Sequence, residues 1–95
     1  MMQLQVGMIV RAIAGKEQGK FYSIIKLDDN FVYLSDGKHR KLEQPKRKNK
    51  KHVRATGTVW DLNGMTNSAL RYKLRQYQDS NSPKEENEFV ERRFD

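Results

Sequence analysis

The side chains best suited to chemistry in this sequence are cationic, and their excess over acidic side chains is concentrated in one stretch. Residues 38–54 hold nine lysines and arginines against one glutamate, whereas the 95 residues together carry a net charge of +7. Ammonium and guanidinium groups at this density neutralise phosphates and release their counterions. The stretch therefore predicts a polyanionic ligand, with nucleic acid favoured over an acidic membrane surface and over a loop that only confers solubility.

A short bend repeats this pattern near the start of the chain. The stretch AGKEQGKFY, residues 14–22, places Gly15 and Gly19 four positions apart, each followed by a lysine. Glycine reaches positive φ angles without steric cost, so both glycines can serve only to turn one strand into the next. Bare glycine backbone also lets a phosphate come close, and Lys16 and Lys20 would attract it. The residues alone leave both interpretations open.

The candidate phosphate contacts form one set. The first choices are Lys46, Arg47, Lys48, Lys50 and Lys51, and the further candidates are Lys16, Gly19, Lys20, Lys38, Arg40, Lys41 and Arg54. They share one surface if the bend and the basic loop meet at one end of the fold, which is a hypothesis at this point. Tyr22, Tyr33 and Trp60 could stack on bases, but their spacing favours core packing.

Nothing in the sequence indicates catalysis. Asp28, Asp29 and Asp36 stand at turns, where aspartate bonds its own backbone, and no serine has the spacing of a catalytic triad. Cysteine is absent, which excludes disulfides and thiolate metal sites. We expect no enzymatic activity, no cofactor and no metal.

No segment approaches the roughly 20 apolar residues of a membrane span, and no secretory signal pattern stands at the start. We therefore expect a cytoplasmic protein without a membrane partner, and leave its oligomeric state open.

The apolar pattern predicts five short strands that position these cations. They cover residues 6–14, 21–27, 31–35, 38–42 and 53–60, with a solvated basic loop over 44–52. Asp36-Gly37 is typical of a two-residue hairpin turn, and Pro45 should end the fourth strand. The first strand has apolar residues on both faces, so a further element should cover Ile9 and Ile13.

A helix is the predicted cover. Residues 66–77 place Leu70, Leu74 and Tyr77 on one stripe, with three possible N-caps before them and a stop at DSNS, residues 79–82. Beyond it lies an acidic tail in which Ser82 and Glu85 would form a capping box for a second short helix. This tail could also fold back over the basic loop, a further hypothesis.

Together these elements predict a mainly β fold, a small SH3-like barrel of about five strands with one or two C-terminal helices. An open antiparallel sheet backed by the helix is the competing architecture. The expected divisions are residues 1–60 for the barrel with its basic loop, 61–79 for the helix that packs on it, and 80–95 for the acidic tail or short helix.

The stretch VGMIVRAIAGKEQGKFYSII resembles a KOW motif, with Gly19 at the glycine that defines the motif and with Gly15 and Lys16 opening the bend. SDGKHRKLEQPKRKNKKH extends the likeness to short bacterial KOW-domain RNA-binding proteins, which are similar to KOW-bearing large-subunit ribosomal proteins. The resemblance covers residues 6–60. It implies an SH3-like barrel, RNA binding with ribosomal RNA favoured, and a link to ribosomes or translation. KOW domains of transcription factors also contact proteins, so a protein-interaction module in a transcription or ribosome-associated complex is the alternative.

Overall fold

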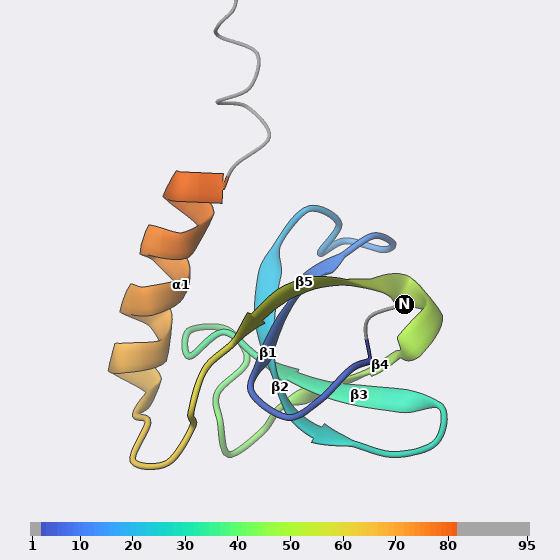
Figure 1. Ribbon diagram of the computed structural model, residues 1–95, viewed down its shortest axis with the longest axis horizontal. Helices are drawn as coiled ribbons and strands as arrows, with labels where there is room; N and C mark the ends of the chain where they lie inside the picture. The colour runs from blue at the N-terminus through green and yellow to red at the C-terminus, as the bar shows by residue number, and fades with distance from the viewer. Residues whose placement is uncertain (1–2, 82–95) are drawn as a thin grey trace, which may run out of the picture.

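The structure is a computed structural model that describes residues 3–81, and it contains a five-stranded antiparallel sheet and one C-terminal helix (Figure 1). The elements are β1 (Met8–Ala12), β2 (Phe21–Leu27), β3 (Phe31–Ser35), β4 (Lys46–Asn49), the 3₁₀ helix η1 (Lys50–His52), β5 (Val53–Val59) and α1 (Asn67–Asn81). The strands lie in the order β4-β3-β2-β1-β5. No helix within residues 3–81 is long and apolar enough to cross a membrane.

The sheet is strongly curved because its two edge strands follow each other in the chain. Only η1 separates the end of β4 from the start of β5. In a flat sheet of five strands, the two edges would lie ~19 Å apart, whereas the four Cα steps of this connection reach ~14 Å at most. Register shifts in the β1–β5 and β2–β3 pairs add local twist. The curl turns one face of the sheet inward (Figure 1).

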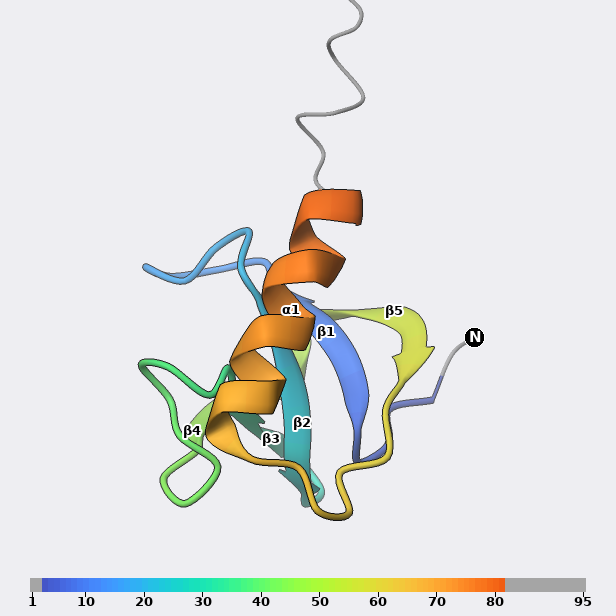
Figure 2. The same ribbon diagram turned by 90° about the vertical axis from the view of Figure 1, so that its left-hand side faces the viewer.

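Two hydrophobic clusters occupy the two faces of the sheet. The inner cluster comprises Met8, Val10, Ala12, Tyr22, Ile24, Val32, Leu34 and Val53. On the outer face, Ile9 and Phe21 pack against Leu70 and Leu74 of α1, as the helical stripe predicts. The predicted cover over Ile9 is therefore confirmed, whereas Ile13 lies outside this cluster and is half-buried. Figure 2 shows α1 crossing in front of β1 and β2.

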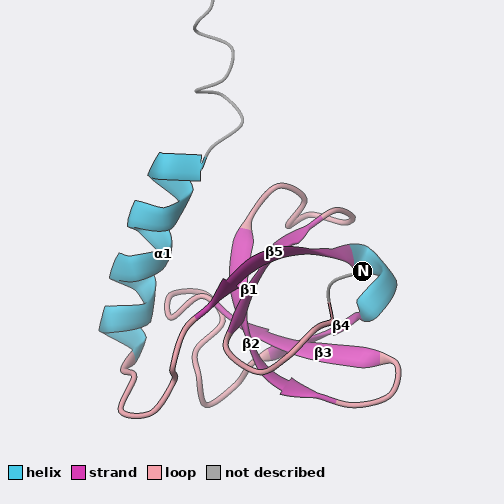
Figure 3. Cartoon of the chain, viewed as in Figure 1, coloured by secondary structure: helices cyan, strands magenta, loops and turns pink. Residues whose placement is uncertain are grey.

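The fourth strand predicted over residues 38–42 is wrong, and the true fourth strand begins after Pro45. Residues 38–42 form bends and turns, whereas residues 46–49, expected in a solvated loop, pair with β3 (Figure 3). The Asp36 carboxylate explains the difference, since it accepts hydrogen bonds of 2.9 Å from the backbone N–H groups of Lys38 and Arg40. These local bonds use donors that a sheet ladder would need.

Asp36-Gly37 does not form a two-residue hairpin; instead, Gly37 packs against the first turn of α1. Gly37 has a φ of +75°, and a Cβ built on it would meet the carbonyl oxygen of Asn67 and lie 3.0 Å from the backbone nitrogen of Arg71. The Asn67 side chain also accepts a hydrogen bond of 2.8 Å from the Leu42 N–H. Leu42 packs on the outer cluster, so its predicted role as an anchor holds although its strand does not. The segment after β3 is thus fastened to the start of α1.

The helix begins and ends differently from its simplest prediction. Among the three possible caps, the Thr66 hydroxyl accepts the bond from the Ala69 N–H at 3.1 Å. The helix continues through Asn81, beyond the stop expected from residue 79, because Asp, Ser and Asn are weak helix formers but not breakers. The predicted second helix and the tail hypothesis fall on residues 82–95, outside the described part of the chain.

Candidate nucleic-acid interface

The bend between β1 and β2 is held by its glycines. Gly15 has a φ of +81° and Gly19 a φ of +91°. The Gly19 N–H donates to the Ala12 carbonyl at 2.8 Å, and the Lys20 N–H donates to the Glu17 carbonyl at 2.9 Å. The turning role of the two glycines is therefore confirmed, and nothing lies within 4 Å of a Cβ built on Gly19. This open space means that no other part of the described chain covers the backbone there.

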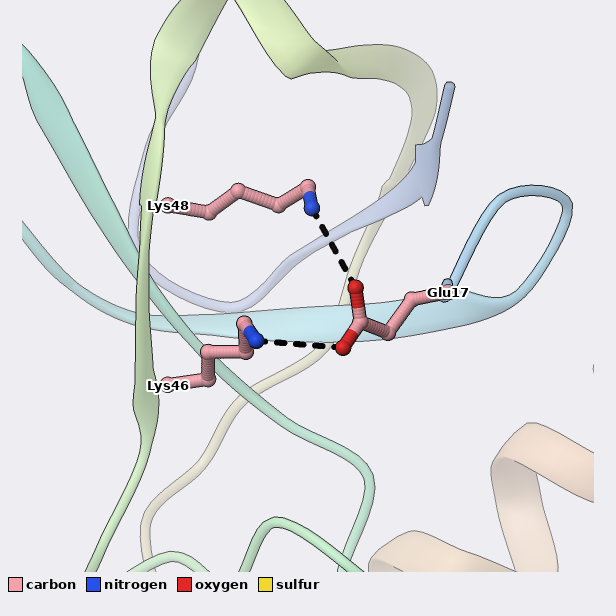
Figure 4. Close-up of polar contacts among 3 residues, drawn as sticks. All are labelled: Glu17, Lys46 and Lys48. Carbon is pink, nitrogen blue, oxygen red and sulfur yellow. Dashed lines mark hydrogen bonds and ion pairs between the residues drawn. The ribbon is translucent and has the colours of Figure 1, made fainter. Parts of the chain in front are cut away.

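Glu17, inside the bend, bridges to β4 (Figure 4). One carboxylate oxygen lies 3.1 Å from Lys46 Nζ and the other lies 3.4 Å from Lys48 Nζ. The side chains of Glu17 and Lys48 are only 16% and 10% exposed, so this ion pair is partly shielded from water. Lys46 and Lys48 lie opposite Leu34 and Val32 in the β3–β4 ladder and share their inner face. The bend and the basic segment therefore meet, through a residue outside the predicted set.

The structure divides the five first-choice cations into three environments. Lys46 and Lys48 face Glu17, and Arg47 points to the other face, where its guanidinium lies 4.6 Å from the Phe31 ring centre. Lys50 and Lys51 belong to η1, where Lys51 is exposed and Lys50 is half-buried. Side chains alternate between the two faces of a strand, which separates Lys46 and Lys48 from Arg47. The sequence analysis could not predict this separation, because it interpreted residues 44–52 as a loop.

The other predicted cations surround this region. Lys16, Lys20, Lys38, Lys41 and Arg54 are exposed, and Arg40 is half-buried. The Ile13 N–H donates to the His52 carbonyl at 2.9 Å, which brings the base of the bend beside η1 and the start of β5. Among residues 3–81, ion pairs within 4.0 Å are formed only by Glu17 with its two lysines. We define the basic face as three exposed cations: Lys16 of the bend, Lys51 of η1 and Arg54 at the start of β5. Lys20, at the end of the bend, lines a separate groove with Lys38.

Two cations that the sequence analysis did not select lie beside Lys20 and Lys38. Arg71 and Arg75 of α1 line a groove with them, between the helix and the loops that precede β2 and follow β3. These arginines stand one helical turn apart, next to the buried Leu70 and Leu74. The i, i+4 spacing was visible in the sequence, but the loops that complete the groove could only be placed by the tertiary structure.

The three aromatic candidates differ in burial. Tyr22 is in the inner cluster, and burial, with the nearby charges of Asp36 and Glu17, raises the pKa of its hydroxyl to about 12. Its predicted core role is confirmed. Trp60 packs against the outer cluster and meets the Tyr77 ring edge-on at 6.0 Å. Tyr33 is half-buried and donates a hydrogen bond to the Asp28 carboxylate at 3.1 Å. Residues 3–81 contain no cluster of three or more side chains that could hold a metal ion.

Comparison with known proteins adds no family assignment. No protein-family model matches the chain. No curated protein matches it significantly. The functional interpretation therefore depends on the residues and their geometry.

Acid should remove the contribution of Glu17 to stability. The hydrogen bond from Lys46, followed by one from the backbone N–H of Glu17 itself, that from Lys48 and the charge of Lys46, lowers the pKa of Glu17 from 4.5 to about 2 against the opposing effect of burial. Because the folded state holds the lower pKa, the stabilisation is complete above pH 4.5 and is lost as the pH falls from there towards 2. After solvent screening we expect it to be on the order of 1–2 kcal/mol.

Urea unfolding of the wild type and Glu17→Gln, near neutral pH and near pH 2, measures this effect. The wild type should be the more stable near neutral pH, and the difference should vanish in acid. An equal difference at both pH values would show that the carboxylate charge is not the cause.

Proposed function

We propose that this protein binds RNA, mainly through phosphates, and that ribosomal RNA is its preferred target. Two observations carry the proposal: the Ile13–His52 hydrogen bond brings the bend beside η1 and the start of β5, and Glu17, the one carboxylate that forms ion pairs among the described residues, ties the bend to β4. Three exposed cations, Lys16, Lys51 and Arg54, are available to neutralise phosphates there.

The proposal includes an SH3-like barrel of KOW type as the scaffold. It is supported by the bend between β1 and β2 with its two positive-φ glycines, and by the three-residue connection that draws the edge strands together. In this arrangement Glu17 acts as a positioning residue, because its two ion pairs hold the bend against β4. Phosphate contacts carry no sequence information, so the RNA would be selected mainly by its shape.

Salt dependence tests the phosphate mechanism directly. The affinity for a labelled short single-stranded RNA is measured by fluorescence anisotropy from about 50 to 400 mM salt. If five or six contacts form, the plot of log affinity against log salt should have a slope near −4, roughly −0.7 for each contact. Absence of binding at the lowest salt, or an affinity that does not change with salt, would contradict the proposal.

Sedimentation tests the ribosomal part of the proposal. We expect the protein in a lysate gradient to migrate with the large ribosomal subunit and to stay there in high salt, because a shaped RNA site adds contacts that salt does not screen. Migration at the top of the gradient in both salts would reject the ribosomal target. RNA binding in the anisotropy assay would then direct the search to other RNAs.

A further inference from the structure

A second cationic surface lies on the helix side of the molecule. The groove between α1 and the neighbouring loops has a volume of about 420 Å³ and is lined in part by Lys20, Phe21, Lys38, Arg71, Leu74 and Arg75. Four of these side chains are cationic, and Phe21 and Leu74 are buried residues of the outer cluster. In Figure 2 the bend and the segment between β3 and β4 lie on the same side of α1.

The four cations come from three separate segments and all are exposed. Lys20 ends the bend, Lys38 follows the Asp36-Gly37 turn, and Arg71 and Arg75 lie on α1. None of the four forms an ion pair within 4.0 Å with a carboxylate of residues 3–81. Their charges are therefore not neutralised by a close partner in the described chain, in contrast to those of Lys46 and Lys48.

Two carboxylates also border the groove, and they do not play the same part. Asp36 uses one oxygen to accept the N–H groups of Lys38 and Arg40, so it serves the turn. Asp79 is exposed and lies one turn beyond Arg75 on α1, where no hydrogen bond engages its carboxylate within the described residues. His39 completes the titratable groups along the groove. Cations outnumber carboxylates by four to two.

We propose that this groove is a second phosphate-binding track, which holds the sugar–phosphate backbone of the same RNA beyond the bend. The inference rests on the proposed function and extends it to α1. Arg71 and Arg75 project from adjacent turns, ~6 Å apart along the helix axis, and guanidinium groups bind phosphate oxygens in bidentate fashion. Lys20 belongs to both the bend and the groove, so an RNA strand leaving the bend meets these arginines next.

The decisive variant is Arg71→Gln/Arg75→Gln, because both side chains are exposed and glutamine supports a helix nearly as well as arginine. Lys26→Gln/Lys73→Gln is the matched control, since it removes two exposed cations outside the groove, one of them on the same helix. We expect the groove variant to bind labelled single-stranded RNA roughly 25-fold more weakly in 0.1 M salt, with its salt slope reduced by about 1.4. The control should change affinity less than about 3-fold.

A third variant changes affinity in the opposite direction. Asp79→Asn removes a carboxylate from the rim, so it should strengthen binding by a few-fold at low salt and leave the protein folded. Circular dichroism verifies that each variant keeps the wild-type structure. Trp60 fluorescence is unsuitable here, because Lys73 Nζ lies 4.9 Å from the Trp60 ring centre and its removal alone would change the signal.

Three results would overturn the inference. Equal affinities of the groove variant and the control would reject the groove while leaving RNA binding intact, whereas a wild type that fails to bind RNA would reject the proposed function as well. Polyglutamate that competes with RNA as effectively as unlabelled RNA of the same charge would indicate an acidic protein partner instead. Loss of affinity in the groove variant alone, with the gain in Asp79→Asn, supports the inference.

Discussion

Gly37→Ala is expected to destabilise the protein by about 3 kcal/mol, which for a domain of this size lowers Tm by roughly 10–20 °C. Two costs combine. The φ of +75° is unfavourable for alanine, and the added Cβ would collide with the Asn67 carbonyl at the first turn of α1. The collision cannot be relieved by rotating a side chain, because the position of a Cβ is fixed by its backbone and the Asn67 carbonyl is itself backbone. The helix must shift away from the sheet, which weakens the packing of Leu70 and Leu74.

Gly19→Ala is the matched control for this prediction. Gly19 has a similarly positive φ of +91°, but nothing lies within 4 Å of its built Cβ. Gly19→Ala should therefore destabilise the protein only through its unfavourable φ angle, by about 1 kcal/mol. Urea unfolding followed by Trp60 fluorescence compares the two variants, because Trp60 packs against Tyr77 of α1. Equal destabilisation by the two substitutions would show that contact with the helix does not determine the role of Gly37.

Neutralising the basic face should have the largest effect on binding. The triple variant Lys16→Gln/Lys51→Gln/Arg54→Gln removes three exposed cations that have no close carboxylate partner in the described chain. If each contacts one phosphate of single-stranded RNA, affinity in 0.1 M salt should fall roughly 100-fold, with about 2 units lost from the salt slope. Stability should change little, because surface charges of this kind contribute little to folding.

Lys46→Gln/Lys48→Gln provides the contrast. These lysines pair with Glu17, so their removal leaves a half-shielded carboxylate without partners and should lower the free energy of unfolding by about 1–3 kcal/mol. The triple variant thus affects binding, and the double variant affects folding. The reverse outcome would mean that the ion-paired lysines, rather than the basic face, contact RNA. Ribosome association that survives the triple substitution would point to a protein contact.

The elements that depend on local patterns were predictable from the sequence. The apolar strands β1, β2, β3 and β5 have β-branched and aromatic runs with clear turn residues between them, and the stripe of α1 identifies its buried face. The conformation of the bend was equally predictable from local sequence, because two glycines that adopt positive φ angles are enough to explain it. The cationic excess of residues 38–54 required only the order of the residues.

The tertiary structure was needed wherever the outcome depends on two segments that are distant in the sequence. Lys46–Asn49 has no apolar residue, yet it is a strand because β3 offers an unpaired edge, and the turn at Asp36 has already used the donors of the residues before it. Glu17 meets lysines about thirty positions away, and Gly37 meets the helix at Asn67. Such contacts are set by how the sheet curls and where the helix docks, so no local pattern contains them. The same distinction holds for the candidate phosphate-binding surfaces. Their positive charge could be read from the sequence, whereas the grouping of the cations into a basic face and a groove depends on the fold.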